Sequence, residues 1–365
     1  MSGSQIYTPS RIFTGTEWLH DYALVIENGI VSDILPVKEL QNRSVTDLTG
    51  SMIIPAFVDL QIYGAGGKLF SVYPDSETLE ILREHCKQGG TSMCLPTVAT
   101  NSTDTVHKCI DAVRNYLSAG GEGIIGIHLE GPWLNPVKRG AHIAEYIHPP
   151  DINEVKDLLE YGKDVIRMIT LAPEVCSIEI LELIASRKIL VSTGHSDATF
   201  EQSKNAFRNG VRTVTHLFNA MSPFHHRAPG LAGAAMDDEE VMASIIPDNY
   251  HVDFSAVRIA KKIMKERLFV ITDAVTATTK GLYPHQLAGE KYEAGGILSG
   301  SALTMIEAVK NLVRHCDVEL GEAIRMCGYY PANLLGLPDY GIIEKGKRAN
   351  ILAIDNEMNI LEFLK

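Results

Sequence analysis

The sequence lacks any apolar run close to the roughly 18 residues that a helix needs to cross a bilayer. The segment 1–11 is polar and has no apolar core of the kind that secretory signals carry. Cysteine is scarce and unpatterned: the six cysteines form no CxxC pair and no zinc-finger spacing. These absences predict a cytoplasmic protein with reduced thiols.

Positive charge is also in short supply. Lysine and arginine number 33 against 45 acidic residues, which gives a formal net charge of −12. Nucleic acid and anionic membranes are therefore disfavoured as partners, although a few local cations could still bind a small anion. With 365 residues, 45% of them hydrophobic, the chain is long and apolar enough to bury a large core.

Both ends of the chain have strand-like patterns. Residues 23–27 and 30–35 flank an Asn28-Gly29 turn, which is a strong hairpin signal. Residues 349–354 form another strand pattern, and a turn follows at 356–359. We expect one small β-sandwich domain built from residues 1–53 and 344–365.

The middle of the chain, residues 54–343, alternates strands and helices. Eight apolar or β-branched runs occur at 53–62, 91–98, 124–129, 166–171, 189–193, 213–217, 241–246 and 268–272. Helical patterns between them cover 76–88, with Ser76 as N-cap, 103–118, 152–161, 178–186 and 200–208. The pattern predicts a (β/α)8 TIM-type barrel, with a doubly wound sheet as the alternative. No GxGxxG or Walker loop follows the first strand, which argues against nucleotide binding.

Four polar residues end apolar strands: Glu130, His195, His216 and Asp273. In a barrel these ends converge on one mouth, where the active site forms. One carboxylate and two imidazoles suit a hydrolytic metal site, and a further carboxylate could move protons. Each residue alone also has a structural interpretation, such as a helix cap or a buried histidine, and spacing leaves both open.

Several segments carry a family resemblance. They read PAFVDLQIYGAGGK from Pro55, EGPWLNPVKRGAH from Glu130, GHSDAT from Gly194, HLFNAMSPFHHRAPGLAG from His216 and LSGSALTMIE from Leu298, with ITDAV around Asp273. Together they resemble the N-acetylglucosamine-6-phosphate deacetylases of the amidohydrolase superfamily. The resemblance runs in order over residues 54–350.

The resemblance implies that Glu130, His195 and His216 bind one divalent metal ion, most commonly Zn²⁺. A metal of this kind lowers the pKa of a bound water. Asp273 would take a proton from the attacking water and return it to the leaving amine. His142 would hydrogen-bond the carbonyl oxygen of the acetyl group.

The same resemblance assigns the substrate contacts and the assembly. The sugar would be bound by Ala141, His142, Asn219, Ala220, Leu298, Ser299 and Gly300. Arg227 and His251 would bind the 6-phosphate as charge-assisted donors. The family forms dimers in which some phosphate contacts come from the neighbouring subunit, so a homodimer is expected.

One feature departs from many amidohydrolases. Gln61 and Tyr63 stand where a His-x-His pair often ends the first strand, and neither residue is a good second zinc ligand. We therefore expect a single catalytic metal. Of the other residues, His128 is interpreted as a satisfied barrel histidine and His285 as a surface residue. Trp133 would either stack on the sugar or pack under its loop.

Three alternative functions remain. The first is deacetylation of N-acetylgalactosamine 6-phosphate, because the epimer differs in the direction of one hydroxyl. The second is another amidohydrolase activity on a small cyclic amide, such as a dihydroorotase-like reaction. The third is a sugar-phosphate binding protein without catalysis, which would be expected to lack Asp273 or a metal ligand; all four residues are present.

Overall fold

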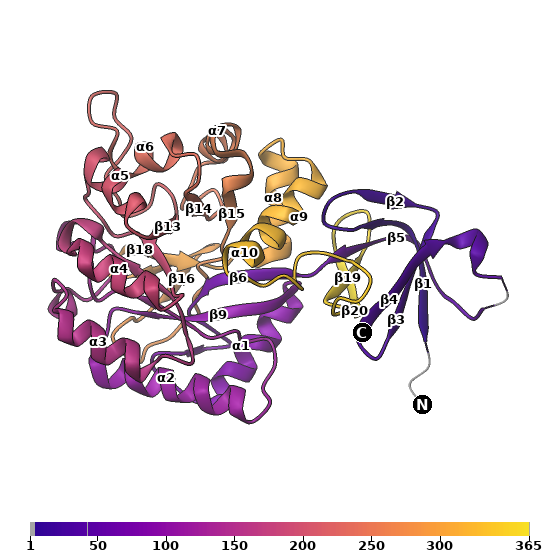
Figure 1. Cartoon of the computed structure of the whole chain (residues 1–365), viewed down its shortest axis with the longest axis horizontal. Helices are drawn as coiled ribbons and strands as arrows, with labels where there is room; N and C mark the ends of the chain where they lie inside the picture. The colour runs from indigo at the N-terminus through magenta and orange to yellow at the C-terminus, as the bar shows by residue number, and fades with distance from the viewer. Residues whose placement is uncertain (1–3, 42, 365) are drawn as a thin grey trace. The chain divides into compact units, whose positions relative to one another are not determined.

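A computed structural model of the chain describes residues 4–41 and 43–364 (Figure 1). Residues 1–3, 42 and 365, which the predicted β domain includes, lie outside the described residues. Backbone contacts divide the chain into two compact units. One comprises Met1–Asp59, Cys86–Ser92 and Thr304–Lys365, and the other Leu60–His85 and Met93–Leu303. The domain boundaries inferred from the sequence stay predictions.

A parallel eight-stranded sheet, most of whose residues belong to the second unit, has strands that neighbour one another in chain order. The strands are β6 (Phe57–Ile62), β9 (Thr91–Ala99), β10 (Ile127–Glu130), β11 (Ile166–Leu171), β12 (Leu190–Thr193), β13 (Val211–Val214), β14 (Met242–Ile245) and β15 (Leu268–Val270). The Asp273 N–H donates to the Gln61 carbonyl (3.0 Å), and the Tyr63 N–H donates to the Ala274 carbonyl (2.9 Å). These bonds join the two edges, so the predicted (β/α)8 barrel is confirmed.

Helices follow most of the strands and lie around the outside of the sheet (Figure 1). They are α1 (Ser76–Gln88), α2 (Thr103–Ser118), α3 (Ile152–Tyr161), α4 (Ile178–Ser186), α5 (Phe200–Arg208), α6 (Gly230–Asp237) and α7 (Phe254–Met264). The first five match the predicted ranges. Ser76 as the cap of α1 is wrong, because the Asp75 carboxylate accepts the Thr78 N–H (2.8 Å).

The first unit contains one seven-stranded sheet with strands from both ends of the chain. They are β1 (Gln5–Phe13), β2 (Trp18–His20), β3 (Tyr22–Glu27), β4 (Ile30–Pro36), β5 (Thr46–Pro55), β19 (Ile351–Ile354) and β20 (Ile360–Leu364). At the predicted hairpin Asn28 and Gly29 have φ of 54° and 72°, as a type I′ turn requires. This unit also contains α8 (Met305–His315), α9 (Leu320–Cys327) and α10 (Tyr329–Leu334).

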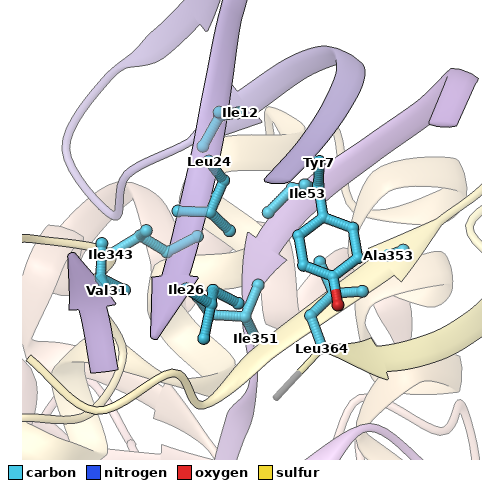
Figure 2. Close-up of a cluster of buried hydrophobic side chains, with 10 residues drawn as sticks. All are labelled: Tyr7, Ile12, Leu24, Ile26, Val31, Ile53, Ile343, Ile351, Ala353 and Leu364. Atoms are coloured by element: carbon cyan, nitrogen blue, oxygen red, sulfur yellow. The ribbon is translucent and has the colours of Figure 1, made fainter. Parts of the chain in front are cut away.

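Strands from both ends share one hydrophobic core (Figure 2). Tyr7 and Leu24 from the N-terminal strands pack in the same cluster as Ile351 and Leu364 from the C-terminal strands. Burial of one such side chain contributes about 1.5–3 kcal/mol. This shared core explains why two segments far apart in sequence form one β domain, as predicted.

Two features differ from the expected strands. The apolar run 53–62 belongs to two strands, because β5 ends at Pro55 and β6 begins at Phe57. Two small sheets were not predicted, one of β7 (Gly64–Ala65) and β8 (Lys68–Leu69), the other of β16 (Gln286–Ala288), β17 (Lys291–Ala294) and β18 (Ile297–Ser301). Within the described residues, no helix is both long and apolar enough to span a membrane.

Candidate active site

Four strand ends bring the polar residues singled out in the sequence to one end of the barrel. Glu130 is the last residue of β10, and His195, His216 and Asp273 follow β12, β13 and β15. Their side chains are buried: the four residues are 2%, 6%, 4% and 8% exposed in the same order. The last three also have a positive φ, of 47°, 36° and 53°. Such backbone conformations cost about 1–3 kcal/mol each and cluster at functional sites.

Three side chains form a compact donor set for a metal ion. One ligand atom from each of Glu130, His195 and His216 lies within 4.8 Å of the other two. Glu130 Oε1 is 3.2 Å from His216 Nε2 and 3.5 Å from His195 Nε2, and the two Nε2 atoms are 3.1 Å apart. Among the described residues this is the only group of its kind.

The chemistry of these atoms fits a cation. His195 Nδ1 lies 3.0 Å from the Lys138 carbonyl oxygen, which can only accept, so Nδ1 carries the proton. The lone pair on His195 Nε2 therefore points toward the Glu130 carboxylate and the His216 ring. A divalent ion would be held by two imidazoles and one carboxylate, a set typical of catalytic zinc sites that keep an open position.

The charges around Glu130 follow from this arrangement. Burial alone would raise the pKa of the Glu130 carboxyl, but the three imidazoles around it outweigh burial and hold that pKa well below its usual value. Burial lowers the pKa of His142 to about 4, so this imidazole is neutral at pH 7.

The tautomer of His142 is set by Thr100. The Thr100 backbone N–H, which can only donate, lies 3.3 Å from His142 Nδ1, and the Thr100 hydroxyl lies 2.8 Å from the same atom. The proton of the neutral ring is therefore on Nε2, which donates to Glu130 Oε2 at 3.1 Å. His142 presents an N–H donor beside the metal-ligand set.

Gln61 and Tyr63 connect the two carboxylates of the site. Gln61 Nε2 donates to Asp273 Oδ1 (2.7 Å) and lies 3.0 Å from Glu130 Oε1, and the Tyr63 hydroxyl donates to Glu130 Oε2. Burial raises the pKa of the Tyr63 phenol well above its usual value, so it stays a donor. Burial also raises the pKa of Asp273, and the charge of Glu130 adds to this, while the His216 ring opposes it.

Tyr63, Asp273 and the three candidate metal ligands line a cavity of about 340 Å³. Eight of the predicted substrate contacts line it as well: Ala141, His142, Asn219, Ala220, His251, Leu298, Ser299 and Gly300. Arg227 does not; it is exposed on the loop after β13, between His225 and Ala228, which form a β-bridge. The structure thus brings together every predicted site residue except this arginine.

Some residues that line the cavity were not predicted from the sequence. Lys138 is the cavity's one lining lysine or arginine within the described residues, and its ammonium lies 3.3 Å from Asp197. The surface interpretation of His285 is wrong, because it is buried, lines the cavity and bonds Ser299 Oγ at 2.9 Å. His285 directly precedes β16, which the sequence did not predict, so no strand or helix spacing indicated its position.

Two residues left open by the sequence are now placed. Trp133 is fully buried and does not line the cavity, so it packs under its loop, and its indole N–H lies 3.3 Å from Glu154. His128 lies inside the barrel, with Thr170 at 2.7 Å and Thr97 at 3.3 Å, as the interpretation of a satisfied histidine predicts.

Comparisons with known proteins agree with this architecture. The chain matches the Amidohydrolase family over residues 52–364 and the NagA composite domain over residues 6–53. It is 37% identical to an N-acetylglucosamine-6-phosphate deacetylase from Haemophilus influenzae, covering 93% of this chain and 92% of that one. It is 31% identical to an N-acetylgalactosamine-6-phosphate deacetylase from Escherichia coli O157:H7, covering 96% and 95%.

A solved structure is similar over almost the whole chain. The crystal structure of N-acetylglucosamine-6-phosphate deacetylase from Pasteurella multocida superposes with a TM-score of 0.93 at 36% identity, covering 98% of this chain and 97% of that one. A closed parallel barrel with a Glu-His-His donor set at its mouth is the arrangement expected of a metal-dependent barrel hydrolase. The chain belongs to the amidohydrolase family and, within it, to the N-acetylglucosamine-6-phosphate deacetylases.

Proposed function

We propose that the protein hydrolyses N-acetyl-D-glucosamine 6-phosphate to D-glucosamine 6-phosphate and acetate. The observation that carries this proposal is the set of buried candidate ligand atoms on Glu130, His195 and His216, placed beside Asp273 in one cavity. The similarity to deacetylases over more than nine-tenths of the chain supports the choice of substrate. The relative from Escherichia coli O157:H7 favours N-acetylgalactosamine 6-phosphate as the second candidate.

The proposed cofactor is one Zn²⁺ ion per chain, held by Glu130, His195 and His216. When bound, such an ion supplies a Lewis acid that polarises the amide carbonyl and lowers the pKa of a nearby water. Gln61 and Tyr63 occupy the place where a second ligand pair would be needed, and both are engaged as hydrogen-bond donors. This favours a single ion.

The chain's own residues perform the remaining steps. The His142 Nε2–H, which donates to Glu130 Oε2 in this structure, would instead donate to the carbonyl oxygen of the substrate, where negative charge develops as the amide is attacked. Asp273 accepts a proton from the attacking water and delivers it to the nitrogen, because an amine leaves only once it is protonated. Burial raises the pKa of Asp273 and so makes its carboxylate a stronger base for the first of these two proton transfers.

Substrate recognition is proposed for the residues that line the cavity. Asn219, Ala220 and the segment 298–300 would contact the sugar, and His251 the phosphate. Arg227 is exposed and outside the cavity of its own chain, so we propose a homodimer in which it reaches the phosphate in the neighbouring subunit. A cytoplasmic location is part of the proposal, and it is favoured by the six cysteines, none of which lies in a disulfide within the described residues.

Replacement of Asp273 tests the mechanism. Asp273→Asn should keep its zinc, because Asp273 is outside the ligand set, and kcat for acetate release should fall about 10²–10⁴-fold. Zinc content and kcat are measured on the same preparation. A variant that keeps both its zinc and the wild-type rate would remove Asp273 from the mechanism.

A further inference from the structure

Gln61 lies where the two edges of the barrel sheet meet, and it holds Asp273 at two points. Its backbone carbonyl accepts the Asp273 peptide N–H (3.0 Å), and its side-chain Nε2 donates to Asp273 Oδ1 (2.7 Å). Gln61 is fully buried, so water does not compete for either bond. One residue thus fixes both the main chain and the carboxylate of Asp273.

Thr215 determines which end of the Gln61 amide faces the carboxylates. The Thr215 hydroxyl donates to Gln61 Oε1 at 2.6 Å, which turns the NH₂ end toward Asp273 and Glu130. Nε2 lies within hydrogen-bond distance of oxygens of Tyr63, Glu130 and Asp273, and the contact to Asp273 is the shortest of these. With the amide reversed, its carbonyl oxygen would face carboxylate oxygens that have no hydrogen to donate.

The arrangement has a consequence for the proton that Asp273 carries. Two carboxylates in one buried cavity repel each other, and an uncharged N–H donor between them offsets that repulsion without adding a charge. Within the described part of the chain, the hydrogen bond to the Asp273 carboxylate falls on Oδ1. This leaves Oδ2 as the atom that accepts and releases the proton.

We propose that Gln61, oriented by Thr215, is a positioning residue that holds the Asp273 carboxylate with Oδ2 directed to the reacting groups. The inference rests on the proposed function, because it assigns Gln61 a part in the proton transfer by Asp273. It does not depend on which hexosamine epimer is the substrate. A misplacement of about 1 Å in a reacting group can lower a rate about 10²-fold, so the effect is measurable.

The chain offers a matched pair of substitutions for the test. Thr215→Val replaces the hydroxyl that orients Gln61 with a methyl group of similar size. Thr213→Val makes the same exchange two residues earlier, at a threonine that is also buried and whose hydroxyl has no hydrogen-bond partner among the described residues. Thr215→Ser keeps the hydroxyl and serves as the conservative rescue, and Gln61→Leu removes the amide itself.

Zinc-loaded variants are compared for kcat, KM, zinc content and thermal stability. Thr215→Val and Gln61→Leu should lower kcat at least about 10-fold, with KM within about threefold and zinc retained. Thr215→Ser and Thr213→Val should keep kcat within about twofold of wild type. If Thr215→Val keeps the kcat of Thr213→Val, or loses its zinc, the positioning role is contradicted. Should Gln61→Leu fail to fold, Thr215→Val decides.

A crystal structure of Thr215→Val separates this inference from the proposed function. The expected result is a rotated Asp273 carboxylate or a reversed Gln61 amide, with the Nε2–Oδ1 hydrogen bond broken. An unchanged Gln61–Asp273 pair would overturn the inference. Failure of the wild-type protein to release acetate would instead overturn the proposed reaction, and the crystal structure would still decide whether Thr215 and Gln61 position Asp273.

Discussion

At the scale of single residues, neighbouring groups determine which ring nitrogen of each histidine in the site carries the proton. Lys138 contributes a backbone carbonyl that keeps the proton of His195 on Nδ1, and Thr100 contributes an N–H that keeps the proton of His142 on Nε2. The ring centres of His142 and His195 are only 4.3 Å apart, yet the two Nε2 atoms differ in protonation and so in function. His195 offers a lone pair to a cation, and His142 offers a hydrogen to an oxygen.

His142 can be tested by truncation. His142→Ala removes the Nε2–H donor and should lower kcat about 10²–10³-fold, as the loss of an oxyanion donor does. Zinc content should not change, because His142 is outside the ligand set. His148→Ala is the control, since His148 is exposed and pairs with Glu154. Equal rates for the two variants would contradict the donor role.

At the scale of strands and loops, the sequence specifies the barrel well and the site in part. Helix boundaries were predictable where apolar spacing and a capping residue coincide, as in α2, where Ser102 accepts the Thr105 N–H. The strand ends of the candidate site were predictable because a polar residue ends an apolar, buried strand, as Glu130 does in β10. The role of Gln61 was not predictable, because it depends on the rotamers of residues far apart in sequence.

The loop after β10 depends on a glycine that directly follows Glu130. Gly131 has a φ of +86°, and a Cβ there would lie 2.1 Å from Thr100 Oγ1. Gly131→Ala should destabilise the protein by more than about 2 kcal/mol in urea unfolding. Gly120, with a φ of +84° and open space around it, is the matched control. Gly120→Ala should lower the free energy of unfolding by about 1–2 kcal/mol. Equal destabilisation of the two variants would show that the close approach to Thr100 does not add to the effect of the positive φ.

At the scale of the whole molecule, the net charge of −12 makes local cations necessary for binding a sugar phosphate. The cavity contains Lys138 and His251, while Arg227 is exposed outside it. If Arg227 serves the neighbouring subunit, each site is completed only in the dimer.

Mixing two defective variants tests this arrangement. Arg227→Ala and Asp273→Asn should each be impaired at low substrate concentration. After subunit exchange, half of the dimers are mixed, and each has one site with an intact Asp273 that receives Arg227 from its partner. Activity should recover to about a quarter of wild type. No recovery, although mixed dimers are present, would show that Arg227 does not act across an interface.

The proposed reaction is tested most directly by measuring acetate release from N-acetylglucosamine 6-phosphate. Chelator-stripped protein is assayed before and after zinc is restored, with the galactosamine epimer alongside. The stripped protein should be inactive, and one zinc per chain should restore rapid release, faster for the gluco substrate. Full activity without metal, or no release from either sugar phosphate with zinc bound to Glu130, His195 and His216, would contradict metal-dependent deacetylation by this protein.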